Sequence, residues 1–295
     1  MKKILYPILA VMTFVIMQTF AAVAIMVAAF IKDPGMLKDL AKRGDPNAFA
    51  ETLMSAETLA WTVIISGILT IGVIALLKMI DWKQVLCFKC INWKLGIVSI
   101  AGAIFGIFSL GIVEEMLDLP DLMEDQWTDL SNSLIGALAI GLIGPIIEEF
   151  IFREAVLGYM LRGGVNKWVA IVSSGLAFGL IHMNPAQIPF AASIGIILGI
   201  IYYKTGNIVI TCILHILNNS MAVWQMYTMG EAAKEFSLIE WLGGQGYAVG
   251  IGCAVAILSF VLLRHFWKSY LSAQWNNIQQ TEQLTNQTTQ YETVL

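Results

Sequence analysis

Charged residues are scarce in this sequence of 295 residues. They make up 13% of the chain, while hydrophobic residues make up 58%; a soluble globular protein has about 25% charged residues. Seventeen lysines and arginines are too few to cover a soluble surface of this size, and a net charge of −4 provides no basic stripe for nucleic acid. Composition therefore excludes a disordered chain, a coiled coil and a nucleic-acid-binding protein. It indicates an all-α, polytopic membrane protein.

Cysteine is also rare, with four residues in the chain, so no disulfide framework is expected. Cys87 and Cys90 form a single C-x-x-C, and no second pair completes a four-thiolate zinc site. We therefore predict two ordinary thiols in a loop. Cys212 and Cys253 lie inside apolar runs, which predicts that they pack as small hydrophobic side chains.

What the sequence has in abundance is long uncharged runs. A helix crosses the hydrocarbon core of a bilayer in about 20 residues, so these runs predict eight transmembrane helices. One run, 168–203, is too long for a single span and contains two prolines, which predicts two short helices joined by a tight turn. The other runs are 4–31, 58–77, 95–113, 130–147, 205–230 and 241–263.

The distribution of basic residues predicts the orientation in the membrane. If the spans alternate, nearly all basic residues fall on one side, while the segment 114–129 on the other side has seven acidic residues and no basic one. Only the segment 32–58 mixes both signs. We predict a multi-pass protein of the cell (inner) membrane with both termini in the cytoplasm.

The same pattern predicts three regions along the chain. Residues 1–129 form a three-span N-terminal region, and residues 130–267 form a second membrane domain. Residues 268–295 form a polar cytoplasmic tail that is rich in Gln, Asn and Thr.

Ionisable residues inside or next to the spans are the strongest functional signal, because their burial in a membrane is costly. Glu148, Glu149 and Arg153 directly follow the apolar run 130–147. Glu149 and Arg153 are four residues apart, so on a continuing helix they share a face and can pair. The alternative is that these charges merely end the span at the membrane surface, and spacing alone leaves both interpretations open.

Two of the three histidines, His182 and His215, fall inside apolar runs, and Asn219 lies one helical turn after His215. A single buried histidine is usually a packing residue, but two of them beside a glutamate pair favour a site. Gly163-Gly164 predicts a turn. In the resulting hairpin Glu148 and His182 lie roughly 24 and 27 Å from the turn at 1.5 Å per residue. We therefore predict that these two side chains meet.

Three motifs occur in order on successive predicted helices. They are Glu-Glu-x-x-x-Arg beginning at Glu148, Phe-x-x-x-His ending at His182, and His-x-x-x-Asn beginning at His215. Together they resemble the CPBP intramembrane proteases, which include the type II CAAX prenyl endopeptidases and related bacterial bacteriocin-processing and immunity proteins. The resemblance covers about residues 130–225, and it implies that residues 130–267 form the catalytic membrane domain.

The resemblance implies an intramembrane endopeptidase that cleaves a membrane-associated protein or peptide, either prenylated or leader-bearing. It implies that Glu148 activates the attacking water and that His182 helps to hold this water. His215 and Asn219 would stabilise the oxyanion. The supporting residues of the first motif are Glu149 and Arg153.

A metal-dependent reaction is the alternative chemistry. Glu148, His182 and His215 could form a zinc site with two histidines, one carboxylate and an open position. The His-Glu-x-x-His helix of many zinc proteases is absent. We favour a metal-free reaction, and zinc stays the one cofactor to consider.

Two other classes of protein fit intramembrane polar residues. A transporter would be favoured by internal duplication, which the sequence does not show. A non-catalytic membrane scaffold or immunity protein would tolerate the loss of a motif residue, and none is lost. The expected partners in every case are the lipid bilayer and a membrane-associated protein or peptide, and not nucleic acid.

Overall fold

The structure, a computed structural model, describes residues 2–35, 55–273 and 275, and the regular elements in these ranges are helices without a β-strand. The all-α prediction is confirmed. The first half contains α1 (Lys2–Lys32), α4 (Ala56–Leu76), η1 (Phe88–Cys90), α5 (Trp93–Leu117), α6 (Glu124–Asn132), α7 (Leu134–Leu138), η2 (Ala139–Ile143) and α8 (Gly144–Glu148). The second half contains η3 (Glu149–Gly158), α9 (Tyr159–Arg162), α10 (Lys167–Leu180), α11 (Gln187–Thr205), α12 (Val209–Met229), η4 (Gly230–Ala233), α13 (Leu238–Trp241) and α14 (Gln245–Ser269).

Within the described ranges, six helical segments are long and apolar enough to cross a membrane: α1, α4, α5, the continuous segment 134–162, α11 and α14. The protein is therefore a polytopic membrane protein. The predicted count of eight spans is not confirmed. The two remaining predicted spans correspond to α10, which has 14 residues, and to α12, whose apolar sequence is interrupted by histidine and asparagine.

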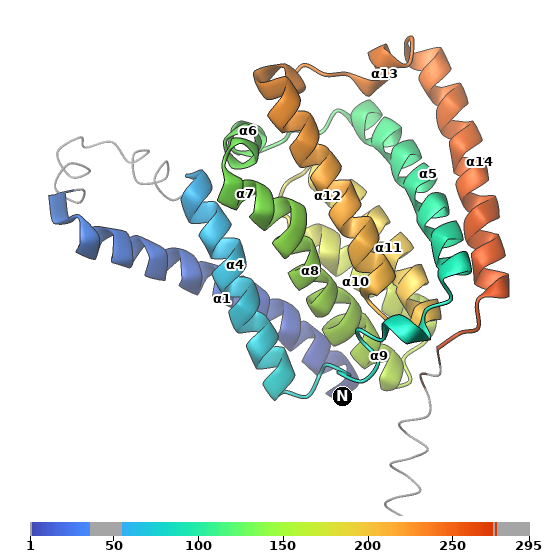
Figure 1. Cartoon of the computed structure of the whole chain (residues 1–295), viewed down its shortest axis with the longest axis horizontal. Helices are drawn as coiled ribbons and strands as arrows, with labels where there is room; N and C mark the ends of the chain where they lie inside the picture. Colours follow the sequence, from blue (N-terminus) through green and yellow to red (C-terminus); the bar gives the residue numbers. More distant parts are fainter. Residues whose placement is uncertain (1, 36–54, 274, 276–295) are drawn as a thin grey trace, which may run out of the picture.

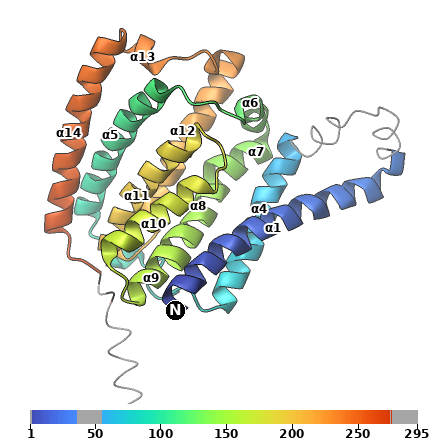
Figure 2. The ribbon, with the colours of Figure 1, turned by 180° about the vertical axis from the view of Figure 1, so that it is seen from behind.

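The helices pack in antiparallel pairs around a central helix, which is the continuous segment 134–162 (Figures 1 and 2). The pair α1–α4 lies on one side of the bundle, the pair α5–α14 lies on the other, and α10 packs along α11. Only 17% of the most apolar stretch of α1 or of α14 is buried, against 50% for the segment 134–162. Apolar helices with mostly exposed surfaces are expected to face lipid, so the central helix and α11, which is 56% buried, are the helices most shielded from the bilayer.

Two π-helical segments interrupt the central helix: η2, the first widened turn, and η3, the second. Proline explains the first. Pro145 has no N–H, and its ring clashes with the carbonyl four residues earlier in a regular α-helix. In η2 the backbone instead adopts π-helical geometry, and the N–H of Gly144 donates to the carbonyl of Ala139, five residues back. The carbonyls of Ile140 and Gly141 are thereby released, and they accept hydrogen bonds from side chains of α12 at 3.0 and 3.1 Å.

The predicted turn after the central helix is confirmed. The helix ends at Arg162, and Gly164 adopts a positive φ of 74°, a conformation that glycine adopts at little cost. Asn166 then caps α10, because its side-chain oxygen accepts a hydrogen bond from the N–H of Trp168 at 2.9 Å.

The structure corrects two predictions on the cysteines. Cys87 and Cys90 are joined by a disulfide, because the short helix η1 brings their Cα atoms to 5.3 Å, a separation that suits this bond. They are not free thiols. Cys212 is buried as predicted, whereas Cys253 is exposed on α14.

The two ends of the bundle differ in charge as the sequence predicts. The start of α1, the α4–α5 connection, the α9–α10 turn and the end of α14 lie at one end, and the acidic connection between α5 and α6 lies at the other (Figure 1). The part of the mixed-charge segment from residue 36 to 54 lies outside the described residues, as do residue 274 and the tail from residue 276 onward.

The orientation leads to a labelling prediction. Lys94 in the first turn of α5 and Glu124 at the start of α6 are exposed. The starts of these two helices lie toward opposite ends of the bundle (Figure 1). In a chain whose native cysteines are replaced by serine, Glu124→Cys should react with a membrane-impermeant maleimide added outside the cell. Lys94→Cys should react only after the membrane is permeabilised. The reverse pattern would contradict cytoplasmic termini.

Candidate active site

The centre of the molecule is a buried ion pair within the second widened turn. The π-helix η3 spans Glu149–Gly158, and all ten of its residues are buried. Such π-turns are frequent at functional sites. Arg153 Nε lies 3.1 Å from Glu149 Oε2, and neither side chain has exposed surface. The predicted pairing of Glu149 with Arg153 is therefore confirmed.

The guanidinium of Arg153 has few other partners. Its carbon atom lies 4.9 Å from the ring centroid of Phe178, and none of its nitrogens makes a hydrogen bond to another described residue. The contact with the carboxylate involves Nε alone, so it is not a bidentate fork. Charge compensation and stacking on the aromatic ring are what hold this side chain.

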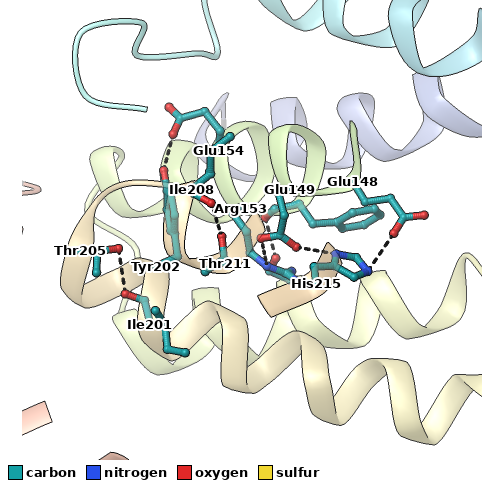
Figure 3. A network of polar contacts seen from close by, with 12 residues as sticks. Glu148, Glu149, Arg153, Glu154, Ile201, Tyr202, Thr205, Ile208, Thr211 and His215 are labelled. Atoms are coloured by element: carbon teal, nitrogen blue, oxygen red, sulfur yellow. Dashed lines mark hydrogen bonds and ion pairs between the residues drawn. The ribbon is translucent and has the colours of Figure 1, made fainter. Parts of the chain in front are cut away.

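His215 lies between two carboxylates that come from the central helix (Figure 3). Its Nδ1 is 3.0 Å from Glu149 Oε1, and its Nε2 is 3.4 Å from Glu148 Oε2. Because an ionised carboxylate can only accept a hydrogen bond, Nδ1 is the protonated nitrogen and donates to Glu149. The second nitrogen is thereby directed at Glu148.

The two adjacent glutamates have different environments. Glu149 has no exposed surface, whereas the side chain of Glu148 is 19% exposed. Close packing positions both of them: a Cβ atom on Gly67 of α4 would lie 2.2 Å from the side chain of Ile147, so only glycine lets α4 approach here. Glu148 is thus the carboxylate that water or a substrate can reach.

We predicted that the side chains of His182 and Glu148 meet, and this prediction is wrong. Among the described residues, no hydrogen bond or ion pair joins the two side chains. The helix α10 ends at Leu180, so His182 lies on the following turn, where its Nδ1 is 2.9 Å from the carbonyl oxygen of Phe178. The link between the two histidines is the ring of Phe178. It makes edge-to-face contacts with His182 and His215, with centroid distances of 5.1 and 5.4 Å.

Asn219 lies on α12 one turn after His215, as predicted, and contacts the first widened turn. Its side-chain N–H donates to the released carbonyl of Ile140 at 3.0 Å, and its oxygen accepts a hydrogen bond from Asn218 at 3.1 Å. One amide hydrogen of Asn219 therefore stays available for another acceptor.

The three residues that could form a zinc site do not cluster. Among the described residues, no group of three His, Cys, Asp or Glu side chains is close enough to hold a metal ion. Glu148 and His215 are neighbours, but His182 is engaged with the carbonyl of Phe178. This arrangement does not fit a zinc site with two histidines and one carboxylate, and we derive no step through a metal.

A second buried ionic cluster, which the sequence analysis missed, lies at Glu154. One carboxylate oxygen accepts hydrogen bonds from Arg162 at 2.6 Å and from the backbone N–H of Asp81 at 2.9 Å. The other accepts from the hydroxyl of Tyr202. A Cβ atom on Gly158 would lie 2.5 Å from that hydroxyl, so glycine is needed for this approach. The cluster ties the α4–α5 connection to the central helix.

The sequence carried one signal for this cluster. Glu154 follows Arg153 directly in an otherwise apolar stretch, so a second buried charge required a partner. Arg162 is the next basic residue along the helix, eight residues later. Tyr202 and Asp81 are 48 and 73 residues away in sequence, and no local spacing indicates them.

Fold and site together define a class: a polytopic membrane protein with a glutamate–histidine centre buried among its helices. Comparison with known proteins agrees with this class. Residues 130–221 match the Rce1-like type II CAAX prenyl endopeptidase family. The matched segment holds all six predicted site residues. No solved structure matches the chain.

Two curated bacterial proteins are similar to the chain. The membrane-embedded CAAX protease MroQ of Staphylococcus aureus (strain USA300) is 30% identical over 101 residues, which cover 32% of this chain and 41% of MroQ. The putative membrane peptidase YdiL of Bacillus subtilis (strain 168) is 25% identical over 221 residues, which cover 72% of this chain and 86% of YdiL. The similarity to MroQ thus spans less than half of that protein.

The buried ion pair leads to a stability prediction. Arg153→Ala leaves the carboxylate of Glu149 without compensation, and removing one member of a buried pair costs about 3–5 kcal/mol. Arg153→Lys should restore part of this loss, because the observed contact requires a cation and not a bidentate fork. The measurement is the unfolding midpoint of the purified protein in detergent. An unchanged midpoint for Arg153→Ala would show that the pair is incidental.

Proposed function

We propose that this protein is a membrane-embedded endopeptidase that hydrolyses a peptide bond in a membrane-associated protein or peptide, in the cell membrane. One observation carries the proposal: Glu148 and Glu149 flank His215 inside the helix bundle, within the segment that matches the Rce1-like family. The relatives named as a CAAX protease and as a putative membrane peptidase support the same reaction class.

In the proposed reaction, Glu148 is the general base. It is the accessible carboxylate of the pair, and its Oε2 lies 3.4 Å from His215 Nε2, so one water molecule can bind beside both atoms. One proton of the water passes to Glu148 while the oxygen adds to the scissile carbonyl carbon. When the carbon–nitrogen bond breaks, the same proton passes from Glu148 to the leaving amine.

The other residues position this base. Glu149 accepts a hydrogen bond from the Nδ1–H of His215, and the neutral imidazole with this tautomer has Nε2 as an acceptor for the water. Arg153 compensates the charge of Glu149. This geometry favours a role for His215 in holding the water, in place of the predicted role as an oxyanion donor. His182, linked to His215 through Phe178, lines the same region.

Asn219 is the proposed oxyanion donor. Its remaining amide hydrogen can donate to the carbonyl oxygen as it acquires negative charge, and such donors act strongly where water is excluded. The contact with Ile140 fixes the amide before the substrate binds. A donor that is already oriented requires no reorganisation during the reaction.

A groove of about 690 Å³ lies between α6, α7, η2 and α12. Its lining includes Gly141 and Ser220, which follow Ile140 and Asn219 in the chain. Most of its lining is apolar and includes the exposed side chains of Leu134, Trp224 and Tyr227. We propose that an apolar segment of the substrate lies in this groove, as expected for a membrane-associated peptide.

Replacement of the base separates turnover from folding. Glu148→Gln should abolish cleavage of fluorogenic membrane peptides in proteoliposomes while leaving the unfolding midpoint near that of the wild type. Glu149→Gln is the matched control, because it removes the partner of Arg153 and should also lower the midpoint. Undiminished cleavage by Glu148→Gln would contradict the assignment of the base.

The same assay tests the metal-free chemistry. Incubation with a chelator and dialysis should leave the cleavage rate unchanged. If the chelator abolishes cleavage and zinc restores it, the reaction depends on a metal, and the proposed role of Glu148 as a metal-free base is wrong.

Loss of the oxyanion donor should have a smaller effect. Removing one such donor usually costs about 10²–10³ in turnover, so Asn219→Ala should cleave slowly with nearly unchanged KM. Asn218→Ala, which removes the neighbouring amide, should retain most of the activity. Equal losses in the two variants would show that Asn219 has no special part in the reaction.

A further inference from the structure

Two lysines contact the ring of Trp267 at the end of the bundle where α10 begins and α11 ends. Lys204 is only 7% exposed, and its ammonium makes one hydrogen bond, to the hydroxyl of Ser272 at 2.8 Å. Lys167 is partly buried. Neither ammonium has an acidic partner among the residues that the structure describes. A largely buried cation without a carboxylate is costly, so this pair has an unmet need for an anion.

Aromatic rings bring the two lysines together. The ammonium of Lys167 lies 5.2 Å from the ring centroid of Trp267, and that of Lys204 lies 5.0 Å from the same centroid. Trp168 and Tyr203 stack on Trp267 with centroid distances of 5.4 and 5.5 Å. Ring faces attract cations but carry no net charge. They hold the lysines in place and leave the positive charge uncompensated.

The cluster lies where three helices begin or end. Lys167 begins α10, Lys204 lies in the last turn of α11, and Trp267 lies in the last turn of α14. The ends of membrane helices are where tryptophan and tyrosine are enriched beside lipid headgroups. An anion that reaches this position from the bilayer is the phosphate of a phospholipid.

We propose that Lys167 and Lys204 bind the phosphate of an anionic phospholipid headgroup. The site is separate from Glu148 and His215, and the proposal does not depend on the endopeptidase reaction. A zwitterionic lipid carries its own cation and compensates the two lysines less well than phosphatidylglycerol does.

The test uses the full chain, purified in detergent without added lipid. Phosphatidylglycerol and phosphatidylcholine are titrated separately, and bound lipid is counted by native mass spectrometry. Phosphatidylglycerol should bind more tightly, and Lys167→Gln should weaken its binding about five-fold, since each lysine near a membrane surface contributes about 1 kcal/mol. Lys94→Gln, which changes an exposed lysine at the same end of the bundle, should have no effect.

Three outcomes would overturn the proposal. They are equal binding of the two lipids, equal weakening by Lys94→Gln and Lys167→Gln, and saturation of the site by millimolar inorganic phosphate with no preference for lipid. The last outcome would mean that the site takes a free anion. Lys204→Gln is a second variant, and because Lys167 is less buried, Lys167→Gln keeps the test decisive even if Lys204→Gln does not fold.

Discussion

The negative charge of a carboxylate without exposed surface, within a membrane-embedded helix, must be compensated by neighbouring groups. Glu149 has two such neighbours. Arg153 compensates its charge at 3.1 Å, and His215 donates to it at 3.0 Å. Isolated ionised groups are too costly in a low-dielectric interior to persist unpaired. The position of the imidazole, the direction of its second nitrogen and the stacking of Arg153 on Phe178 all follow from this requirement.

The backbone of the central helix is adapted to the same centre. Pro145 prevents regular α-helical bonding in the preceding turn, and the carbonyls released there are the ones that fix Asn219 and Ser220 of α12. A residue that weakens the helix therefore strengthens its contact with the neighbouring helix. At the other end, the cluster around Glu154 anchors the α4–α5 connection. The site thus lies between two points where the central helix is held.

Local pattern predicted much of this arrangement. The apolar runs located the helices, the four-residue spacing predicted the pair Glu149–Arg153, and Gly163-Gly164 predicted the turn. The distance of His182 from the hairpin turn did not predict the position of its side chain correctly. The helix α10 ends two residues before His182, and the turn that follows changes the direction of the side chain. The partners of Glu154 and the disulfide between Cys87 and Cys90 depend on tertiary packing and on η1, which spacing does not reveal.

The proposed reaction depends on which nitrogen of His215 is protonated and donates the hydrogen bond to Glu149. The chain has three histidines, so protein labelled with ¹⁵N-histidine gives a simple spectrum, and His215→Gln assigns the resonance. Solid-state NMR in lipid should show Nδ1 of His215 protonated and hydrogen-bonded to a carboxylate. A neutral imidazole protonated only on Nε2 would contradict the account, because Glu149 could then neither orient His215 nor leave Nε2 free to hold water beside Glu148.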